Sequence, residues 1–448
     1  MISVESRLPV ERCQMRILKI IHGYPPWYNA GSEVYSQMLC QGLAQRHEVH
    51  VVTREEDPFR EDFSWQTLPD PQEARVTLHR VNIPGEKYRN CYRQPLVDKQ
   101  LGYLLQTLQP DIVHIGHLNH LSTSFVSCIA AQGIPIVYTL HDYWLMCPRG
   151  QFIQRNPAKK KAELWAFCDE QADRKCAVNC YAGYFSGAVD EQATDIAYWT
   201  TWVQRRMEHI REIIKQVDHF IAPSRYLYDR HVAAFALPDD KVTYLDYGFD
   251  LQRLTNRQRL PQQPFTFGYI GTHIPTKGIQ HLIQAFGLLK GACQLHIWGR
   301  PRPHHTVGLQ RIAATLPPEV QSRITWLPEY SNQQLVTAVL NQVDCVVVPS
   351  IWAENSPLVI HEALQVRLPV ITADCGGMAE YVNHEVNGLL FKHRSVSSLA
   401  EQMQRLLDKP ALAKKLGARG YLQSADGNIP NLTTHLAEIE RLYLRLLH

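Results

Sequence analysis

The stretch from residue 343 to residue 380, VDCVVVPSIWAENSPLVIHEALQVRLPVITADCGGMAE, decides the fold predicted for this chain. Its β-branched run at 345–349 predicts a buried strand, and Leu368–Ala373 predicts a second one. Between them, Ser356 and Pro357 have the features of the N-cap and the first residue of an apolar helix. A strand, a helix and a strand within about 30 residues form a βαβ unit with parallel strands. Ligands bind such units where strands end and helices begin.

Two carboxylates lie in this unit, Glu354 in the loop and Glu362 inside the helix, with seven residues between them. Glu354 is placed to reach a ligand above the edge of the sheet. The helix N-terminus beside it offers N–H groups and the positive end of a dipole, which suit a phosphate. Glu362 could accept hydrogen bonds from a polyol such as ribose. An ordinary surface glutamate and a solvated helix glutamate explain the same pattern equally well.

Length, composition and charge limit the class of protein. The 448 residues, 45% of them apolar and 20% charged, suit two globular domains rather than a disordered chain. A net charge of +3 is too small to indicate a nucleic-acid partner. No apolar run approaches the ~20 residues that span a bilayer, and the N-terminus lacks the apolar segment of a signal peptide. With eleven cysteines that are expected to be reduced thiols, these features predict a cytoplasmic location.

The beginning of the chain predicts a Rossmann-like βαβ unit. Residues 15–21 and 48–53 predict strands on either side of a helix that begins after Gly31. The G-x-G-x-x-G fingerprint of dinucleotide-binding proteins does not occur between them. Gly31 by itself is also consistent with a plain turn before the helix.

The chain then leads to a histidine at the end of a strand. Residues 55–110 are expected to be irregular up to a helix just before 110, and 111–115 and 134–140 predict two more buried strands. The second strand runs directly into His141, which would therefore lie at the ligand-binding edge of a sheet. A histidine that merely caps the strand end remains the alternative.

A repeated motif indicates two domains of the same doubly wound architecture. VDHFIAPS at residues 217–224 returns as VDCVVVPS at residues 343–350. The last residues space apolar side chains by four and three, which predicts an amphipathic helix. The division predicted from these features is a first domain at 15–250 with an insertion near 145–200, a polar linker at 251–264, a second domain at 265–428 and a terminal helix at 429–448.

The second domain is expected to begin with a strand at 265–270 and the loop GTHIPTKG at 271–278. Lys277 would lie at the start of the next helix, where an ammonium group can hold a diphosphate. Arg300 follows the next strand. A solvated lysine in a loop explains Lys277 equally well.

Four cysteines lie within 34 residues of the insertion: Cys147, Cys168, Cys176 and Cys180. Four thiolates can hold a structural Zn²⁺ ion. Their spacing lacks the C-x2-C pair of zinc knuckles, so four independent thiols are the alternative.

Taken together, the E-x7-E pattern after a Pro-Ser strand end, the segment LPVI and the segment GGMAE resemble the donor site of retaining glycosyltransferases of family 4. The motifs follow one another in the family's order along most of the chain. The resemblance implies the α/β GT-B fold, in which two Rossmann-like doubly wound domains face each other across a cleft. It also implies that the C-terminal helix crosses back to the first domain.

The resemblance also implies roles for individual residues. In such a site Gly31 lets the backbone approach the donor diphosphate, and His141 contacts the reacting sugar and the acceptor side. Lys277 holds the diphosphate, Glu354 the donor sugar hydroxyls and Glu362 the ribose. The remaining donor-binding positions are Asn355, Ser356, Pro357 and Leu358.

One departure from the family's pattern concerns the diphosphate clamp. The family usually has an arginine shortly before the lysine, but this chain has Thr272 and His273 there. Arg300 is the residue that could compensate for the missing arginine.

The expected function is therefore transfer of a sugar, with retention, from a nucleotide sugar to a glycan, a lipid-linked or a small-molecule acceptor. No cofactor is required for this chemistry, and a Zn²⁺ ion would be structural only. No nucleic acid and no transmembrane segment are expected, although peripheral membrane contact is compatible with this function. A non-catalytic nucleotide-sugar-binding protein and a sugar phosphorylase or epimerase on the same fold are the alternatives.

Overall fold

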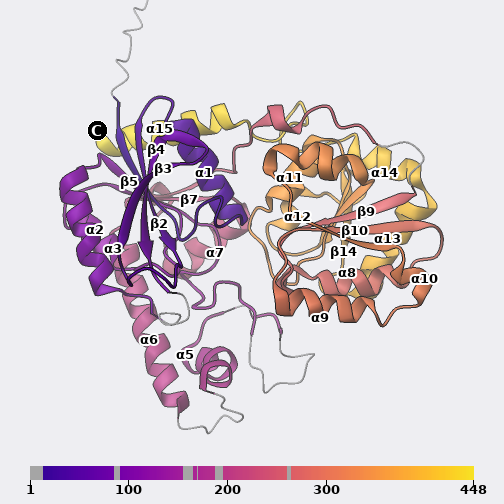
Figure 1. Cartoon of the computed structure of the whole chain (residues 1–448), viewed down its shortest axis with the longest axis horizontal. Helices are drawn as coiled ribbons and strands as arrows, with labels where there is room; N and C mark the ends of the chain where they lie inside the picture. The colour runs from indigo at the N-terminus through magenta and orange to yellow at the C-terminus, as the bar shows by residue number, and fades with distance from the viewer. Residues whose placement is uncertain (1–13, 85–90, 155–164, 169, 187–194, 260–263) are drawn as a thin grey trace, which may run out of the picture.

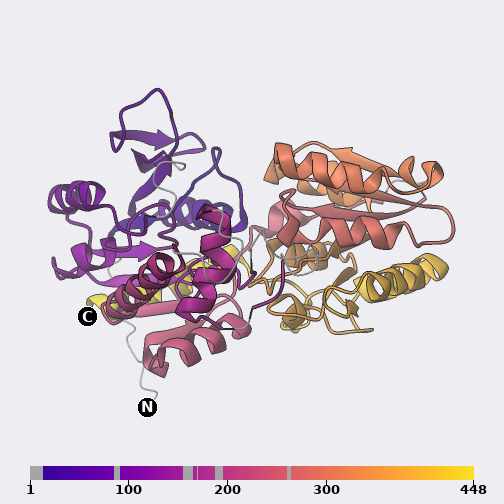
Figure 2. The same cartoon turned by 90° about the horizontal axis from the view of Figure 1, so that it is seen from below.

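The chain folds into two lobes, each built on a largely parallel sheet with helices on both faces (Figure 1). In the computed structural model the described residues are 14–84, 91–154, 165–168, 170–186, 195–259 and 264–448. The two sheets are seen side by side in Figure 1, and the view in Figure 2 shows the same separation. This architecture confirms the predicted α/β class with two Rossmann-like domains.

The first lobe contains an eight-stranded sheet with the strand order β3-β4-β2-β1-β5-β6-β7-β8. Its strands are β1 (Arg16–Ile20), β2 (Glu48–Glu55), β3 (Trp65–Asp70), β4 (Glu73–Asn82), β5 (Ile112–Ile115), β6 (Ile136–Thr139), β7 (His219–Ala222) and β8 (Val242–Tyr244). Neighbouring strands are parallel, except that β3 and β4 form an antiparallel hairpin. Strands β5, β6 and β7 are buried along their whole length, as expected for a sheet covered on both faces.

The hairpin corrects the expectation of irregular structure between residues 55 and 110. Strand β3 is an edge strand, and most of its side chains are exposed or only partly buried. Pro69 is tolerated there because the N–H of an edge residue need not join a ladder. An edge strand without a buried face gives little periodicity, so the sequence pattern did not reveal it.

Helices cover both faces of this sheet. The helices of this lobe are α1 (Gly31–Leu43), α2 (Pro95–Leu108), α3 (Phe125–Ala130), α5 (Asp173–Cys176), α6 (Asp195–Ile214) and α7 (Arg225–Phe235); α5 and the π-helix at Ala177–Ser186 that continues it pack against α6. The long helix α6 extends from the lobe toward α5, at the lower left of Figure 1.

The second lobe contains a six-stranded, fully parallel sheet with the order β11-β10-β9-β12-β13-β14. Its strands are β9 (Phe265–Ile270), β10 (Cys293–Trp298), β11 (Ile324–Leu327), β12 (Cys345–Val348), β13 (Val370–Ala373) and β14 (Gly388–Phe391). Its helices are α8 (Ile279–Phe286), α9 (Pro303–Ala313), α10 (Pro318–Gln321), α11 (Leu358–Gln365), α12 (Met378–Tyr381), α13 (Val396–Asp408) and α14 (Pro410–Gly417). The stretch quoted at the outset supplies β12, α11, β13 and α12.

The last helix, α15 (Leu432–Leu447), leaves the second lobe and lies on the first (Figure 1). Its buried face packs against α1, where the Tyr35 hydroxyl and His435 Nε2 are 2.8 Å apart. Farther along, Tyr443 and His114 Nδ1 are 2.6 Å apart. The predicted crossing of the C-terminal helix is confirmed.

The lobes also touch directly around the end of β12. The Tyr143 hydroxyl of the first lobe donates to Ala353 O of the second at 2.7 Å, and Ser224 Oγ donates to Asn355 Oδ1 at 2.6 Å. These buried bonds fix the position of the residues 353–355 relative to the first lobe. Among the described residues, no helix combines the length and the hydrophobicity that crossing a membrane requires.

Candidate active site

The loop between β12 and α11 is the centre of the site. Helix α11 begins at Leu358 with Pro357 as its N-cap residue, and no side chain caps it. The expectation that Ser356 is the N-cap is wrong. Ser356 instead donates its hydroxyl to Asp246 Oδ1 at 2.9 Å, because a bond to a buried carboxylate is stronger than a bond to a backbone N–H. The first N–H groups of α11 therefore have no side-chain acceptor, which suits an anionic ligand.

Asp246 holds this loop in place through hydrogen bonds. Besides Ser356, its carboxylate binds His361 Nε2 at 2.8 Å and accepts from the Tyr421 hydroxyl at 3.0 Å. Burial by itself raises the pKa of Asp246, but His361 and the hydrogen bonds outweigh this effect and lower the pKa below its usual value. No local pattern in the sequence predicts this role, because Asp246 is more than 100 residues from the loop that it holds.

Lys277 and Glu354, both predicted site residues, are in direct contact. Lys277 Nζ lies 2.7 Å from Glu354 Oε2, and Ser350 Oγ donates to Glu354 Oε1. The loop that carries Lys277 approaches β12 closely at Gly278, where φ is +74° and a Cβ would lie 1.8 Å from Pro349 O. Only glycine fits there, so the contact between the lysine and the carboxylate is built into the backbone.

Glu362 is held by an arginine from the segment between the lobes. Arg253 Nη2 lies 2.6 Å from Glu362 Oε1, and both side chains are about nine-tenths buried. The carboxylate keeps its second oxygen for a ligand hydroxyl. The sequence does not predict a role for Arg253, because its segment has the composition of an ordinary polar linker.

His141 lies across from this loop on the first lobe. Its Nδ1 is 2.6 Å from the Tyr247 hydroxyl, while its buried Nε2 has no hydrogen-bond partner in the described structure. Burial, with smaller contributions from Lys19 and neighbouring histidines, lowers the pKa of His141 well below its usual value, so the ring is neutral. Asn355 Nδ2 donates to His141 O at 3.4 Å, which joins the two halves of the predicted site.

Gly31 and Arg300 approach the boundary between the lobes from opposite sides. A Cβ on Gly31 would lie 3.8 Å from Leu358 Cδ1, so the start of α1 faces the start of α11. Arg300 Nε is 2.8 Å from Glu329 Oε1, and its Nη1 reaches Trp27 O of the first lobe at 3.4 Å. These contacts do not include Lys277, so compensation for the missing clamp arginine stays a prediction.

The four insertion cysteines line one small cavity of about 10 Å³. Burial raises the pKa of Cys168 and Cys176, so both thiols are neutral unless a cation lies beside them. Among the described residues, no three histidine, cysteine, aspartate or glutamate side chains are arranged to hold a metal ion.

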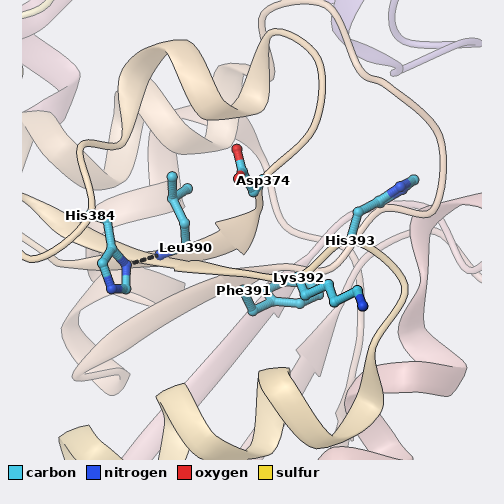
Figure 3. A pocket seen from close by; sticks show the side chains of 6 residues that line it. All are labelled: Asp374, His384, Leu390, Phe391, Lys392 and His393. Atoms are coloured by element: carbon cyan, nitrogen blue, oxygen red, sulfur yellow. Dashed lines mark hydrogen bonds between the residues drawn. The ribbon is translucent and has the colours of Figure 1, made fainter.

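A further hollow, shown in Figure 3, lies elsewhere, near β14. It is lined by Asp374, His384, Leu390, Phe391, Lys392 and His393. Its labelled side chains come from β14, from the residues after it and from two neighbouring segments, and they are not turned toward one point; His384 Nδ1 accepts from Leu390 N at 2.9 Å. It contains none of the predicted donor-binding residues.

Comparison with known proteins identifies the family. The family model described as "Glycosyltransferase Family 4" matches residues 29–253, half of the chain, and the model described as "Glycosyl transferases group 1" matches residues 252–423. The chain belongs to glycosyltransferase family 4. The predicted family and the predicted class of activity, glycosyl transfer, are thereby confirmed.

Relatives of known activity are distant. D-inositol 3-phosphate glycosyltransferase of Nocardia farcinica is 27% identical over 48% of this chain and half of its own length. Glycogen synthase of Mycobacterium tuberculosis is 23% identical over 90% of this chain and 88% of its own length.

Two solved structures share the fold over nearly their whole length. Sucrose-phosphate synthase from Thermosynechococcus elongatus has a TM-score of 0.67 at 19% identity and covers 97% of this chain and 99% of its own. HepE of Anabaena, in a complex with UDP and glucose, has a TM-score of 0.66 at 16% identity and covers 96% of this chain and all of its own. At these identities the likeness shows the GT-B fold of this family 4 glycosyltransferase.

Proposed function

We propose that this glycosyltransferase moves a sugar from a nucleotide sugar to an acceptor with retention at the anomeric carbon. The observation that carries the proposal is the Lys277–Glu354 pair, which lies beside the uncapped start of α11. His141 faces this loop from the other lobe and touches it through Asn355. Groups for a departing diphosphate and groups for an acceptor therefore occupy the two sides of one boundary.

On the donor side, the chemistry depends on the charge of the departing nucleoside diphosphate. Lys277 and the first N–H groups of α11 are placed to receive that charge, and Gly31 leaves room for the diphosphate near Leu358. Glu362, oriented by Arg253, would accept hydrogen bonds from the ribose.

Glu354 is suited to holding the donor sugar rather than to attacking it. Each of its carboxylate oxygens accepts one bond, one from Ser350 and one from Lys277. A carboxylate has about four lone-pair sites, so it can still accept bonds from sugar hydroxyls, while the pairing with Lys277 orients it and makes it a weaker nucleophile. The engagement of Glu354 supports a reaction driven by departure of the diphosphate. The acceptor then attacks the anomeric carbon from the same face of the sugar that the diphosphate leaves.

The relatives support a nucleotide-sugar donor. HepE of Anabaena was solved with UDP and with UDP-glucose. The named activities of the curated relatives differ in acceptor, from glycogen to D-inositol 3-phosphate. The proposed acceptor is therefore a glycan, a lipid-linked sugar or a small molecule. A cytoplasmic location and peripheral membrane contact belong to the same proposal.

A thermal-shift screen with nucleoside diphosphates and nucleotide sugars tests the donor, because a ligand that binds the folded state raises its melting temperature. The nucleotide sugar that binds is then incubated with candidate acceptors, and the anomeric configuration of the product is read by NMR. Retained configuration and release of nucleoside diphosphate are expected. Inverted product, a sugar phosphate formed from inorganic phosphate, an epimerised nucleotide sugar, or binding without turnover would each contradict the proposal.

A structural Zn²⁺ ion at Cys147, Cys168, Cys176 and Cys180 is a separate proposal: the four side chains line a single cavity, but they are not arranged around one point, so binding would require the thiols to turn toward the ion. A four-coordinate structural site would give about one zinc per chain in elemental analysis. Purified chain without metal, and with all four thiols reactive in the folded state, would contradict it. Turnover is expected to continue after chelation, because no step of the donor chemistry needs a metal.

A further inference from the structure

A second cavity lies in the first lobe, next to the loop that follows β6, and encloses about 210 Å³. This is smaller than the pockets that hold drug-sized ligands and suits a single ring-sized ligand. Aromatic and basic side chains dominate its lining, and among the described residues no aspartate or glutamate takes part in it. The side chains used below are Tyr92, Trp144, Arg149, Tyr181, Trp202 and Arg206.

Arg206, on helix α6, is the most unusual member of this lining. Its side chain is only 1% exposed. Its Nη2 donates to Trp144 O at 2.6 Å, its Nη1 contacts Met207 Sδ at 3.3 Å, and its guanidinium lies 4.5 Å from the centre of the Trp144 ring. None of these partners carries a negative charge.

The electrostatic surroundings of Arg206 are also neutral. Burial lowers its pKa, but a guanidinium remains protonated in proteins. The groups that act most strongly on it are the phenols of Tyr92, Tyr138 and Tyr181 and the thiol of Cys147, and burial raises the pKa values of the three tyrosines further above neutrality. A buried cation without a counter-charge is costly, and it usually indicates an anion that is bound in the working protein.

The aromatic side chains offer a surface for a ring. The rings of Tyr181 and Trp202 have their centres 5.0 Å apart, and Tyr92 meets Trp202 edge-on at 5.4 Å. The C–H bonds on the flat side of a sugar or cyclitol ring are attracted to the negative face of such aromatic systems. The cavity therefore combines a stacking surface with a buried positive charge.

The cavity lies on the His141 side of the proposed site. Trp144 belongs to its lining and is only three residues from His141. The ring of His117 lies 5.5 Å from the ring of Trp144, and His117 Nε2 lies 3.2 Å from Asp142 Oδ1. A ligand in the cavity thus lies next to the side of the site assigned to the acceptor.

We propose that this cavity binds a phosphate group carried by the ring of the acceptor, with Arg206 as its counter-charge and the aromatic side chains against the ring. The proposal rests on the function proposed above, since it names the chemistry of that enzyme's acceptor. Arg149 lies in the same lining and adds positive charge. The phosphate can belong to a free sugar phosphate or to a lipid headgroup, because both present the same group to Arg206.

Calorimetric titration of the full chain tests the proposal with glucose 6-phosphate, with glucose, and with vesicles that contain phosphatidylinositol or only phosphatidylcholine. Glucose 6-phosphate or the phosphatidylinositol vesicles should bind, and glucose and the neutral vesicles should bind far more weakly. Arg206→Met should weaken the binding at least ~10-fold, because a charge-assisted hydrogen bond is lost. Arg206→Lys should restore part of it. Arg211→Met, at an exposed position of the same helix, is the control and should bind as the wild type does.

Two further measurements keep the result interpretable. Trp202→Ala leaves Arg206 in place and should still weaken the binding of glucose 6-phosphate, even if Arg206→Met does not fold. Nucleoside diphosphate binding should be unchanged in every variant, which separates this proposal from the donor chemistry. Equal affinity of wild type and Arg206→Met, equal binding of glucose and glucose 6-phosphate, or an equal loss in Arg211→Met would each overturn the proposal.

Discussion

The two copies of the VD…PS motif each lie at the end of a buried parallel strand, β7 or β12, and yet have different roles. After β7 the chain turns at once into α7, and Ser224 caps that helix by accepting from Leu227 N at 3.2 Å. After β12, nine residues separate the strand from α11, and Ser350 donates to Glu354 instead. The same serine therefore stabilises a helix in the first lobe and orients a carboxylate in the second.

The difference shows how one strand end becomes a site. The longer loop after β12 carries Glu354, leaves the start of α11 uncapped and brings Glu354 to Lys277. In the first lobe the start of α7 is fully occupied, because Glu380 of the second lobe also accepts from Arg225 N at 2.9 Å. An occupied helix start joins the lobes, whereas an uncapped one is available to a ligand.

The largest effect on turnover is expected when Lys277, the partner of Glu354, is replaced. Lys277→Ala should lower kcat by at least ~10²-fold, comparable to the loss of one oxyanion donor, because Lys277 is the cation that contacts Glu354 in the described part of the chain and is placed to receive the diphosphate charge. Lys277→Arg should restore activity only in part, since a planar fork does not replace a point charge. Nucleoside diphosphate release is measured beside a melting curve, with the exposed Lys215→Ala as control. Turnover near the wild-type rate would direct the test to Arg300.

A smaller effect, on nucleotide binding, is expected when Glu362 in helix α11 is replaced. Glu362→Ala should weaken nucleoside diphosphate binding by about 1.5–3 kcal/mol, the contribution of a charged hydrogen-bond acceptor. Titration calorimetry with the free nucleotide measures it. Because the variant leaves Arg253 without its partner, Arg253→Met is titrated in parallel and should weaken binding less. Unchanged affinity in Glu362→Ala would remove the ribose role.

The two serines give the most direct test of the comparison itself. Ser350→Ala should lower turnover by roughly 10-fold with little change in stability, because one oxygen of Glu354 loses its donor. Ser224→Ala should instead lower the free energy of unfolding by about 1 kcal/mol through the lost N-cap, with a smaller effect on turnover. Chemical denaturation and product release are measured for both variants. Equivalent behaviour of the two would show that the motif has one role in both lobes.

The smallest effect on turnover is expected at Lys19, a buried lysine in β1 of the first lobe. Lys277 is paired with Glu354. Lys19, in contrast, is 1% exposed, and its Nζ has no hydrogen-bond partner in the described structure. Burial lowers the pKa of Lys19 from 10.5 to about 7. Between these values the unfolded chain binds more protons than the folded one, so stability rises with pH across this window.

Lys19→Met removes this titrating group while it keeps an apolar side chain of similar length. The variant should be more stable than the wild type near pH 7, and its stability should rise less steeply between pH values of about 7 and 10. Urea denaturation at several pH values measures the two slopes, and Lys290→Met, at an exposed position, is the control. Parallel slopes for wild type and Lys19→Met would show that Lys19 is not neutralised by folding.

The sequence predicted the parts of the fold that depend on local patterns. The buried β-branched runs at β12 and β13, and the apolar spacing of α15, are periodic signals that follow from burial itself. The hairpin β3–β4 was missed: the edge strand β3 has no buried face, and the buried positions of β4 are interrupted by polar residues such as His79 and Asn82.

Only the site residues that belong to local sequence motifs were predictable. Lys277, Glu354 and His141 come together as the motifs imply. The roles of Asp246 and Arg253, and the bond from Ser356 to Asp246, depend on contacts between residues more than 100 positions apart. No local spacing encodes such contacts, since they arise only when the lobes have formed.

The most direct test of the central claim is the rate of nucleoside diphosphate release by Glu354→Gln, with the nucleotide sugar that gives the largest thermal shift. The amide keeps the shape of the side chain but removes the charge that orients Lys277 and holds the sugar hydroxyls. We predict at least ~10²-fold slower release with a nearly unchanged melting temperature, and a wild-type rate for the exposed control Glu319→Gln. Release by Glu354→Gln at the wild-type rate would contradict the placement of the donor at the loop between β12 and α11.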